Sequence, residues 1–357
     1  MNKRIQEFLA FYKGHPSDAF LVTKDVNITY LTNFAACESW LLILPQKAFY
    51  ITDFRYILEA KKGLKGIIVK RYGKSIFDTV FAVARDMKIK KIGFDERHMS
   101  LSAYRRFNKC LKGRIKLIAV NGAVESLREV KEKYEINQIK KALRLNLKAY
   151  SFLKGVVKPG MSEREALRRL EVFVKDKGAT FSFDPIIASG PNSCFPHAKV
   201  TDRKIRNNEP VLVDMGIDIG GYKSDLTRVF FLGKIPRPIR EICKIVQTAQ
   251  QKAIDKIKAG VRASEIDHQA RNHITKNGLG KYFGHSLGHG VGLEIHEGPT
   301  ISKTNPAILK AGMVFTVEPA VYIPHKFGIR IEDMVLVTKD GCEVLSRNRK
   351  TDQSCLS

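Results

Sequence analysis

The sequence predicts two domains: an α/β domain, followed by an α+β domain whose helices lie over a curved, mostly antiparallel sheet. The chain has 357 residues, whereas one domain typically holds about 100–200. In the first third, short apolar runs alternate with segments of helical periodicity, which is typical of α/β layers. After Gly178, short segments rich in Val, Ile and Phe alternate with Gly, Pro and Asn turns. This second pattern, interrupted by helical segments, predicts the α+β domain.

The first third predicts a regular alternation of strands and helices. A strand is expected at residues 19–22, followed by the apolar residues 28–31 and a turn at Thr32 and Asn33. Apolar runs on either side of Pro45, at 40–44 and 48–51, predict a hairpin. Helical spacing and short apolar runs then predict helices at 54–62, 76–87 and 100–111 and buried strands at 66–69 and 92–94.

Polar and small residues near 121–126 predict the domain boundary, so we expect domains at residues 1–126 and 127–357. A long amphipathic helix should follow at about residues 131–153. Ser162 should cap a second helix that reaches about Lys177, with Glu165 as its capping-box partner. Two further helices are expected at about residues 238–259 and 263–277.

The composition is ordinary for a soluble globular protein, with 44% hydrophobic and 27% charged residues. No apolar run reaches the roughly 18 residues that a membrane helix needs, and we expect no signal peptide or membrane anchor. The six cysteines are scattered along the chain. That spacing favours free thiols in a reducing compartment, and hence a cytoplasmic location.

The formal net charge of +26 is the one feature that points toward nucleic acid. Residues 1–130 and residues 131–357 share the excess about equally, which indicates a lysine-rich surface and no basic tail. The densest basic runs, at residues 61–65 and 203–206, lack the interleaved aromatics that stack on bases. Weak, non-specific binding of polyanions at low salt would follow from the charge alone.

The most informative stretch is residues 211–231, where two apolar runs flank residues 218–221 and predict a β-hairpin. A centre between Ile219 and Gly220 places Asp214 directly opposite Asp225, with Cβ atoms about 4.5–5.5 Å apart. Two buried carboxylates at that distance repel, so they must share a proton or be neutralised by a cation. A bridged pair of divalent ions fits the spacing, and an acid dyad that shares one proton remains open.

A second cluster lies in residues 284–299, which contain five glycines and the histidines His285, His289 and His296. Glycines let a backbone and a ligand approach closely, and they argue against the helix of H-E-x-x-H zinc proteases. His289 and His296 are an odd interval apart, so both reach one site only if the strand bends near Gly290 or Gly292. Upstream, His197 follows a Gly-Pro-Asn turn, where an exposed histidine without a function is the simpler interpretation.

Two further acids lie in apolar strands, Glu318 at a strand end and Glu332 on the same strand face as Arg330. A surface ion pair would also explain Arg330 and Glu332, and Glu318 could be a lone acid at a strand edge. With the hairpin and His289, however, these acids make four carboxylates and one imidazole. An oxygen-rich set with one nitrogen suits Mn²⁺, Co²⁺, Fe²⁺ or Zn²⁺.

The order of these motifs resembles the pita-bread metallopeptidase family. The strings are V-x-V-D-x-G…G-Y-x-S-D-L-T-R, then G-H-G-V-G-L-E-I-H-E, V-x-E-P and I-R-I-E-D, within about residues 127–346. Residues 28–34 and 52–56 are similar to a creatinase-like N-terminal domain, with Asn33 where that family often has glycine. Methionine aminopeptidases generally lack this domain, so the resemblance favours Xaa-Pro aminopeptidases and Xaa-Pro dipeptidases (prolidases). Cys194 and Phe195, before His197, are bulkier than that family pattern implies.

The resemblance implies two divalent metal ions, Mn²⁺ first, with Co²⁺, Zn²⁺ or Fe²⁺ as alternatives. By resemblance, Asp225 and Glu332 bridge the ions, Asp214 binds one of them, and His289 and Glu318 bind the other. It also implies peptide substrates with proline at the second position, and a homodimer.

The same resemblance implies catalytic roles. Glu318 would act as general base, His296 would stabilise the oxyanion, and His197 would contact the scissile region. His285 would line the pocket, and Arg330 would support the acids or hold a substrate carboxylate.

Three other functions remain open from the sequence. One is a methionine or general aminopeptidase on the same fold. A second is metal-free, creatinase-like chemistry, which the intact set of five ligand types disfavours. The third is a basic homologue that binds nucleic acid or the ribosome, which the charge supports and the complete metal set opposes.

Overall fold

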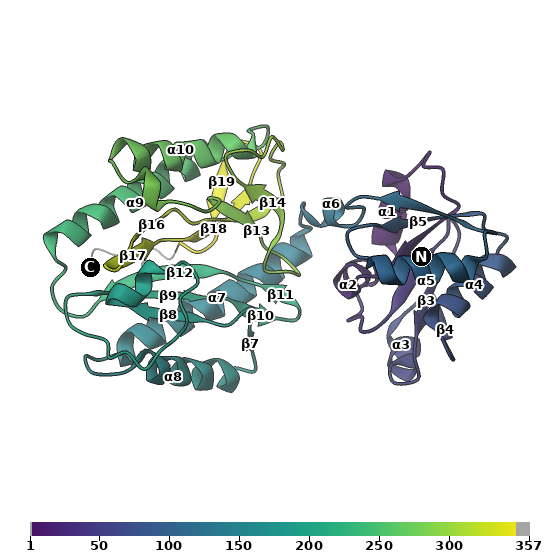
Figure 1. Ribbon diagram of the computed structural model, residues 1–357, viewed down its shortest axis with the longest axis horizontal. Coiled ribbons are helices and arrows are strands. Elements are labelled where there is room, and N and C mark those ends of the chain that lie inside the picture. Colours follow the sequence, from purple (N-terminus) through teal and green to yellow (C-terminus); the bar gives the residue numbers. More distant parts are fainter. Residues whose placement is uncertain (1, 348–357) are drawn as a thin grey trace. The chain divides into compact units, whose positions relative to one another are not determined.

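The computed structural model describes residues 2–347, and their contacts form two compact units that divide between Arg128 and Glu129 (Figure 1). Within residues 2–347, no helix is both long and apolar enough to cross a membrane.

The N-terminal unit is a six-stranded mixed sheet with helices, in the order β4-β3-β2-β1-β5-β6. Strand β5 pairs in parallel with β1 and β6, and β3 pairs in parallel with β4, whereas β2 is antiparallel to both of its neighbours. Its elements are α1 (Lys3–Phe11), β1 (Ala19–Val22), α2 (Asp25–Thr32), β2 (Trp40–Ile43), β3 (Ala48–Thr52), α3 (Ile57–Gly63), β4 (Ile68–Arg71), α4 (Ile76–Asp86), β5 (Lys91–Asp95), α5 (Leu101–Leu111), β6 (Lys116–Val120) and α6 (Glu125–Arg128).

The α/β pattern is confirmed in this unit, with two differences. The strand expected at residues 66–69 begins only at Ile68 and is largely exposed, because β4 is an edge strand paired on one side. Residues 28–31 lie inside α2, which ends at Asn33 with φ 54°, the left-handed conformation that asparagine tolerates. Helices α1 and α6 and strand β6 were not predicted.

The C-terminal unit confirms the α+β class, and every strand pair described in it is antiparallel. Figure 1 shows α9 and α10 covering one side of the strands and α7 and α8 covering the other. Its helices are α7 (Lys133–Val156), α8 (Glu163–Asp176), α9 (Arg237–Lys256) and α10 (Ala263–Lys276), with 3-10 turns η1 (Gly190–Cys194) and η2 (Gly280–Tyr282). Its strands are β7 (Thr180–Phe181), β8 (Ile186–Ser189), β9 (Pro210–Met215), β10 (Ile217–Ile219), β11 (Tyr222–Lys223), β12 (Leu226–Phe231), β13 (Gly288–Gly290), β14 (Glu297–Ile301), β15 (Val314–Val317), β16 (Ala320–Ile323), β17 (Phe327–Arg330), β18 (Asp333–Val337) and β19 (Cys342–Val344).

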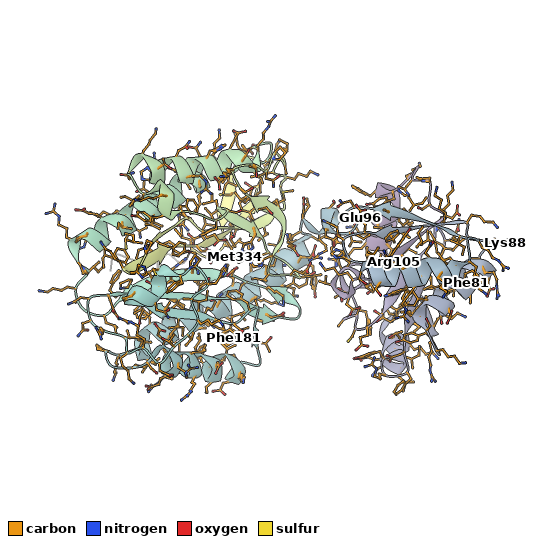
Figure 2. All side chains as sticks on the ribbon, in the orientation of Figure 1. Phe81, Lys88, Glu96, Arg105, Phe181 and Met334 are labelled. Atoms are coloured by element: carbon orange, nitrogen blue, oxygen red, sulfur yellow. The ribbon has the colours of Figure 1, made fainter. Side chains whose placement is uncertain are left out.

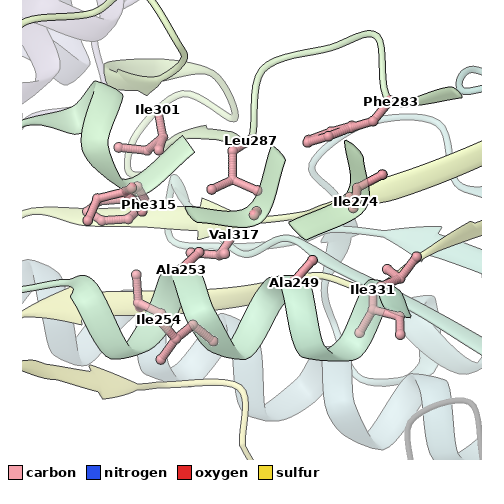
Figure 3. Close-up of a cluster of buried hydrophobic side chains, with 14 of the residues drawn as sticks. Ala249, Ala253, Ile254, Ile274, Phe283, Leu287, Ile301, Phe315, Val317 and Ile331 are labelled. Atoms are coloured by element: carbon pink, nitrogen blue, oxygen red, sulfur yellow. The ribbon is translucent and has the colours of Figure 1, made fainter. Parts of the chain in front are cut away.

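Local sequence rules explain how these helices begin and pack. The Ser162 hydroxyl accepts the Glu165 N–H at 3.1 Å, which satisfies one of the free donors at the start of α8. Helix α9 presents small residues, Ala249 and Ala253, to a buried core that includes Phe315 and Val317 of β15 (Figure 3). Small side chains allow the helix to pack closely on the strands.

One buried amide ties α9 to the two segments that carry the predicted acids. The Gln250 side-chain amide donates to the carbonyls of Val317 (3.0 Å) and Ile331 (3.2 Å). These residues directly precede Glu318 and Glu332 in the chain. The helix therefore fixes the position of both acids through hydrogen bonds to the neighbouring backbone.

The expectation that all cysteines are free is wrong at one position. Cys37, Cys110, Cys194 and Cys342 are free, whereas Cys243 is disulfide-bonded. Cys355 lies outside the described residues. Scattered spacing therefore excludes a dense disulfide framework, but it does not exclude a single bridge.

Candidate metal centre

The hairpin that carries the two aspartates has a register one residue away from the predicted one. Strand β10 pairs with β11 as Ile219 opposite Tyr222, so the centre lies between Gly220 and Gly221. Both glycines have positive φ, 61° and 84°. A two-residue turn of this kind requires positive φ at both central positions, and adjacent glycines meet that requirement.

The corrected register changes the partner of Asp214 but not its face. Asp214 lies opposite Thr227, and Asp225 lies two residues before Thr227 on the same strand side. Because side chains alternate with a period of two, Asp214 and Asp225 still face the same way, as diagonal neighbours. The predicted direct opposition is therefore wrong, while the predicted meeting of the two carboxylates on one face is correct.

A glycine lets the two arms of the hairpin come unusually close beside Asp225. A Cβ on Gly216 would lie 2.3 Å from the Ser224 carbonyl oxygen. The Asn146 amide of α7 donates to the Met215 carbonyl (2.8 Å) and to the Ser224 hydroxyl (3.2 Å), which holds both arms from one side. Asp225 follows this close contact and is almost fully buried.

The five predicted ligands line one cavity of about 870 Å³. Ligand atoms of Asp225, His289 and Glu332 all lie within 4.8 Å of one another. The His289 Nε2 atom lies 3.6 Å from Asp225 Oδ2 and 3.5 Å from Glu318 Oε1. Residues from four separate strand regions thus converge on one point.

A bend brings His289 and His296 together, as the sequence predicted. The pairing of β13 with β14 shifts register between His289 and Gly290, which is a β-bulge. The two imidazole rings are 4.2 Å apart, edge to face. A Cβ on Gly290 would lie 2.0 Å from the Gly298 carbonyl oxygen, so only glycine fits at the bulge.

The carboxylates of this cavity are poorly compensated by the protein alone. Burial, and then repulsion from the other acids, raises the pKa of Asp225 and of Glu332 well above the usual value. Burial also raises the pKa of Glu318 to about 8. Burial lowers the pKa of His289 to about 4, so its imidazole is neutral near pH 7 and available as a ligand.

The residues present fit a divalent metal centre. The buried Asp214 Oδ1 atom has no hydrogen-bond partner among the described residues, although its Oδ2 atom accepts a 2.5 Å bond from Arg330. A buried carboxylate oxygen without a partner is costly unless a cation occupies the position. Carboxylate oxygens with one imidazole nitrogen are a donor set for Mn²⁺, Co²⁺, Fe²⁺ or Zn²⁺.

Arg330 is buried inside the site and is not part of a surface ion pair with Glu332. Its guanidinium donates to Asp214 Oδ2, to the Thr227 hydroxyl at 3.1 Å and to the Tyr322 hydroxyl. Tyr322 in turn lies 3.3 Å from the Nε2 atom of His285. The alternative weighed from the sequence, a solvated pair on a strand face, is therefore wrong.

The remaining predicted histidines also line the cavity. His197 and His296 are exposed, whereas His285 is half-buried. Desolvation lowers the pKa of His285 to about 4 and also lowers that of His296. Two contributors were missed from the sequence, Thr227 and Tyr322. Thr227 lies two residues after Asp225, so the period of the strand could have indicated it.

A second acidic group with a histidine lies in the N-terminal unit, at Asp95, His98 and Glu125. Basic side chains of the protein already compensate the charge of this group, because Glu125 pairs with Arg97 at 2.9 Å and contacts His98 and Lys24. This group is therefore a structural charge network, unlike the cavity of the C-terminal unit.

Residues 137–339 match the family described as Metallopeptidase family M24, and residues 4–130 match the Creatinase/Prolidase N-terminal domain. The chain belongs to metallopeptidase family M24. The resemblance inferred from the motifs is thereby confirmed, together with the two-part fold class.

Relatives of this M24 peptidase match it over nearly its whole length. An Xaa-Pro dipeptidase of Pyrococcus horikoshii is 34% identical over 98% of each chain. The structure of an Xaa-Pro dipeptidase from Bacillus anthracis is 36% identical, covers 97% of each chain and has a TM-score of 0.91. That of an X-Pro aminopeptidase from Thermotoga maritima is 36% identical, covers 94% of this chain and 97% of the other, and has a TM-score of 0.87.

Proposed function

We propose that this M24 peptidase hydrolyses the bond between an N-terminal residue and a following proline, as an Xaa-Pro dipeptidase or aminopeptidase that uses two divalent metal ions. The observation that carries the proposal is the convergence of Asp225, His289 and Glu332 beside the unpartnered Asp214 Oδ1 in one cavity. The relatives named Xaa-Pro dipeptidase and X-Pro aminopeptidase, which share both parts of the chain, support the substrate class.

Asp214, Asp225, His289, Glu318 and Glu332 would hold the two ions. By the family resemblance, Asp225 and Glu332 would serve both ions, Asp214 would serve one, and His289 and Glu318 would serve the other. A divalent pair of this kind, when bound, polarises the substrate carbonyl and lowers the pKa of water. The assignment is supported by the burial of these side chains and by the short distances from His289 to Asp225 and Glu318.

Glu318 is the proposed general base. Its Oε1 atom accepts a 3.2 Å hydrogen bond from the Thr316 hydroxyl, which orients the carboxylate. The other oxygen, Oε2, would accept the proton of the attacking water and return it to the departing proline nitrogen.

The histidines would act on the substrate. His296 is neutral near pH 7, because burial lowers its pKa, and one ring N–H would donate to the developing oxyanion. His197, exposed at the cavity, would contact the scissile region, and His285 would hold the pocket wall through Tyr322. Arg330 would support Asp214 or, in a dipeptidase, hold the substrate carboxylate. Apolar lining residues, Phe183, Ile186 and Ile295 among them, suit a proline ring.

We further propose Mn²⁺ as the preferred ion, a homodimer, and a cytoplasmic location. The oxygen-rich donor set supports Mn²⁺. The four free thiols favour a reducing compartment, whereas the disulfide of Cys243 counts against one. The homodimer follows from the family resemblance.

The test is hydrolysis of Ala-Pro, Ala-Pro-Ala and Met-Ala-Ala, with Mn²⁺, Co²⁺ and Zn²⁺ compared. We expect cleavage of the two proline substrates, and a general aminopeptidase would prefer Met-Ala-Ala. Glu318→Ala and Asp225→Ala should each abolish cleavage while the circular dichroism spectrum is kept, and the exposed control Asp340→Asn should retain it. Xaa-Pro cleavage that survives in either site variant would contradict the proposed mechanism.

A further inference from the structure

We propose that one edge of the N-terminal unit binds the phosphate backbone of double-helical nucleic acid, through charge and without regard to base sequence. The edge is formed where the parallel strands β5 and β6 begin. Its basic side chains, all exposed, are Arg85, Lys88, Lys90, Lys91, Lys109, Lys112, Arg114 and Lys116, and we call this set the basic edge.

The fold brings together side chains that the sequence spreads over more than thirty positions. Lys91 and Lys116 are register partners at the starts of β5 and β6, and the Lys90 carbonyl accepts the Lys116 N–H at 2.8 Å. The loops that carry Lys88 and Lys112 enter these same strand ends from α4 and α5. Adjacent strands lie about 4.8 Å apart, so the charges are close neighbours.

Few acids oppose this charge. Asp86 pairs with Arg85 at 3.0 Å, and Asp78 accepts a 3.2 Å bond from the Cys110 thiol at the end of α5. One oxygen of Asp18 accepts the backbone N–H groups of Lys90 and Lys91, so it is engaged by the backbone. The lysine ammonium groups of the basic edge therefore remain available to an external polyanion.

Helix dipoles explain only part of the pattern. Basic residues in the last turn of a helix interact favourably with its negative end, which accounts for Arg85 in α4 and Lys109 in α5. Lys88 and Lys112 lie directly at the ends of these helices and share this effect, whereas Lys90, Lys91, Arg114 and Lys116 lie in loops or at strand starts. Lys88 and Lys112 adopt positive φ, 57° and 52°, at positions after helix ends that usually hold glycine or asparagine. A lysine therefore occupies each position although the left-handed backbone conformation disfavours any residue with a Cβ atom.

The opposite edge of the same unit carries acids that protein cations largely compensate, because Arg97 pairs with Asp95 and with Glu125. Asp95 ends β5, Glu96 follows it, and Glu125 begins α6. Figure 2 shows Lys88 and Glu96 toward opposite ends of this unit. The opposite edge thus has no comparable excess of one charge, and the basic edge is the part of this unit that would attract a polyanion.

The chemistry of the basic edge favours a duplex over the other polyanions. In residues 2–347, the exposed large hydrophobic side chains lie outside it. A membrane-surface site combines basic residues with apolar side chains that enter the lipid, and a single-strand site adds aromatics that stack on bases. An edge of Lys and Arg alone matches the sequence-independent recognition of a duplex backbone.

The test compares two variants of the full-length, metal-loaded enzyme with equal net charge. The edge variant carries Lys88→Gln, Lys90→Gln, Lys112→Gln and Lys116→Gln. The control neutralises four exposed lysines of the C-terminal unit by the substitutions Lys158→Gln, Lys175→Gln, Lys303→Gln and Lys310→Gln. Fluorescence anisotropy with two short labelled DNA duplexes of unrelated sequence measures Kd over a salt series, and peptidase activity with circular dichroism reports the fold.

We expect the edge variant to bind both duplexes at least about tenfold more weakly, and to lower the slope of log K against log salt by up to about 3.6, because each lost phosphate contact contributes about 0.9. The control should change Kd by less than about twofold. Equal losses in both variants, no duplex binding by the wild type, or preferential binding to phosphatidylserine vesicles or to a labelled single strand would each overturn the proposal.

Discussion

Replacing Thr227 by valine should weaken divalent metal binding while the fold is kept. Thr227 is completely buried, accepts a 3.1 Å hydrogen bond from the Nε atom of Arg330, and donates a 2.7 Å bond to Glu332 Oε2. Arginine can only donate, and an ionised carboxylate can only accept. The single hydroxyl proton of Thr227 is therefore directed at Glu332.

The size of the effect follows from the charge on Glu332. Metal ligands must be deprotonated, while burial and the neighbouring acids raise the pKa of Glu332. A hydrogen bond to a charged group contributes about 1.5–3 kcal/mol, against about 0.5–1.5 kcal/mol for a neutral one. The difference, about 1–1.5 kcal/mol, supports the ionised form that binds metal. Valine removes it, which corresponds to a roughly tenfold weaker affinity for Mn²⁺.

Isothermal titration calorimetry of the metal-free protein with Mn²⁺ measures this affinity without any activity assay. Thr227→Ser is the matched control, because it keeps the hydroxyl and loses only a methyl group. Its affinity should stay near that of the wild type. The reasoning is refuted if Thr227→Val binds Mn²⁺ as tightly as the wild type, or if both substitutions weaken binding equally.

Three further predictions concern stability. Removal of metal by a chelator should lower Tm. Free Mn²⁺ at 100 times its Kd should then raise the free energy of unfolding by about 2.7 kcal/mol. Equal Tm values with and without metal would contradict the proposed metal site. Ser162→Ala should lower the free energy of unfolding, measured with urea, by about 1 kcal/mol, because α8 loses its N-terminal cap. The control Ser151→Ala, at an exposed serine, should lower it by less. Burial alone would raise the pKa of Glu125, but hydrogen bonds from Asn27, the backbone and His98 lower it to about 2. This carboxylate therefore stabilises the fold above about pH 4.5, and the stabilisation is lost as pH falls toward 2. In Glu125→Gln, the free energy of unfolding should change over this pH range by about 1–2 kcal/mol less than in the wild type, after allowance for solvent screening. Thermal unfolding over a pH series measures this, and a pH profile identical to that of the wild type would contradict the prediction.

Local rules predicted most of the fold because the elements obey them. Apolar periodicity predicted α4 and α5, and the Ser162 cap predicted the start of α8. Each of these signals depends on residues only a few positions apart in the chain. The hairpin register was wrong by one residue because two adjacent glycines shifted the turn, and Gly220 and Gly221 could have indicated this from the sequence. The disulfide of Cys243 was not predicted, because cysteine spacing does not reveal which residues meet in the fold.

The site was predictable where a residue broke a local rule, and not where it followed one. Asp214 and Glu332 were found because an acid in an apolar strand conflicts with burial. Tyr322 looks like an ordinary strand residue, and its role exists only because β16 pairs with β17 and places its hydroxyl beside Arg330. The basic edge was likewise invisible to a count along the chain, which found the positive charge spread, because the starts of β5 and β6 meet only in the folded sheet.

The charge balance of the cavity also bears on the number of ions. Asp214, Asp225, Glu318 and Glu332 are opposed by one buried cation, Arg330, so the ionised set has three uncompensated negative charges. One divalent ion would leave one negative charge in an enclosed space, which would repel an anionic nucleophile and a substrate carboxylate. Two divalent ions would leave one positive charge, which would attract both. The buried acids thus favour a pair of ions, and a stoichiometry of one Mn²⁺ per chain at saturation would contradict this balance.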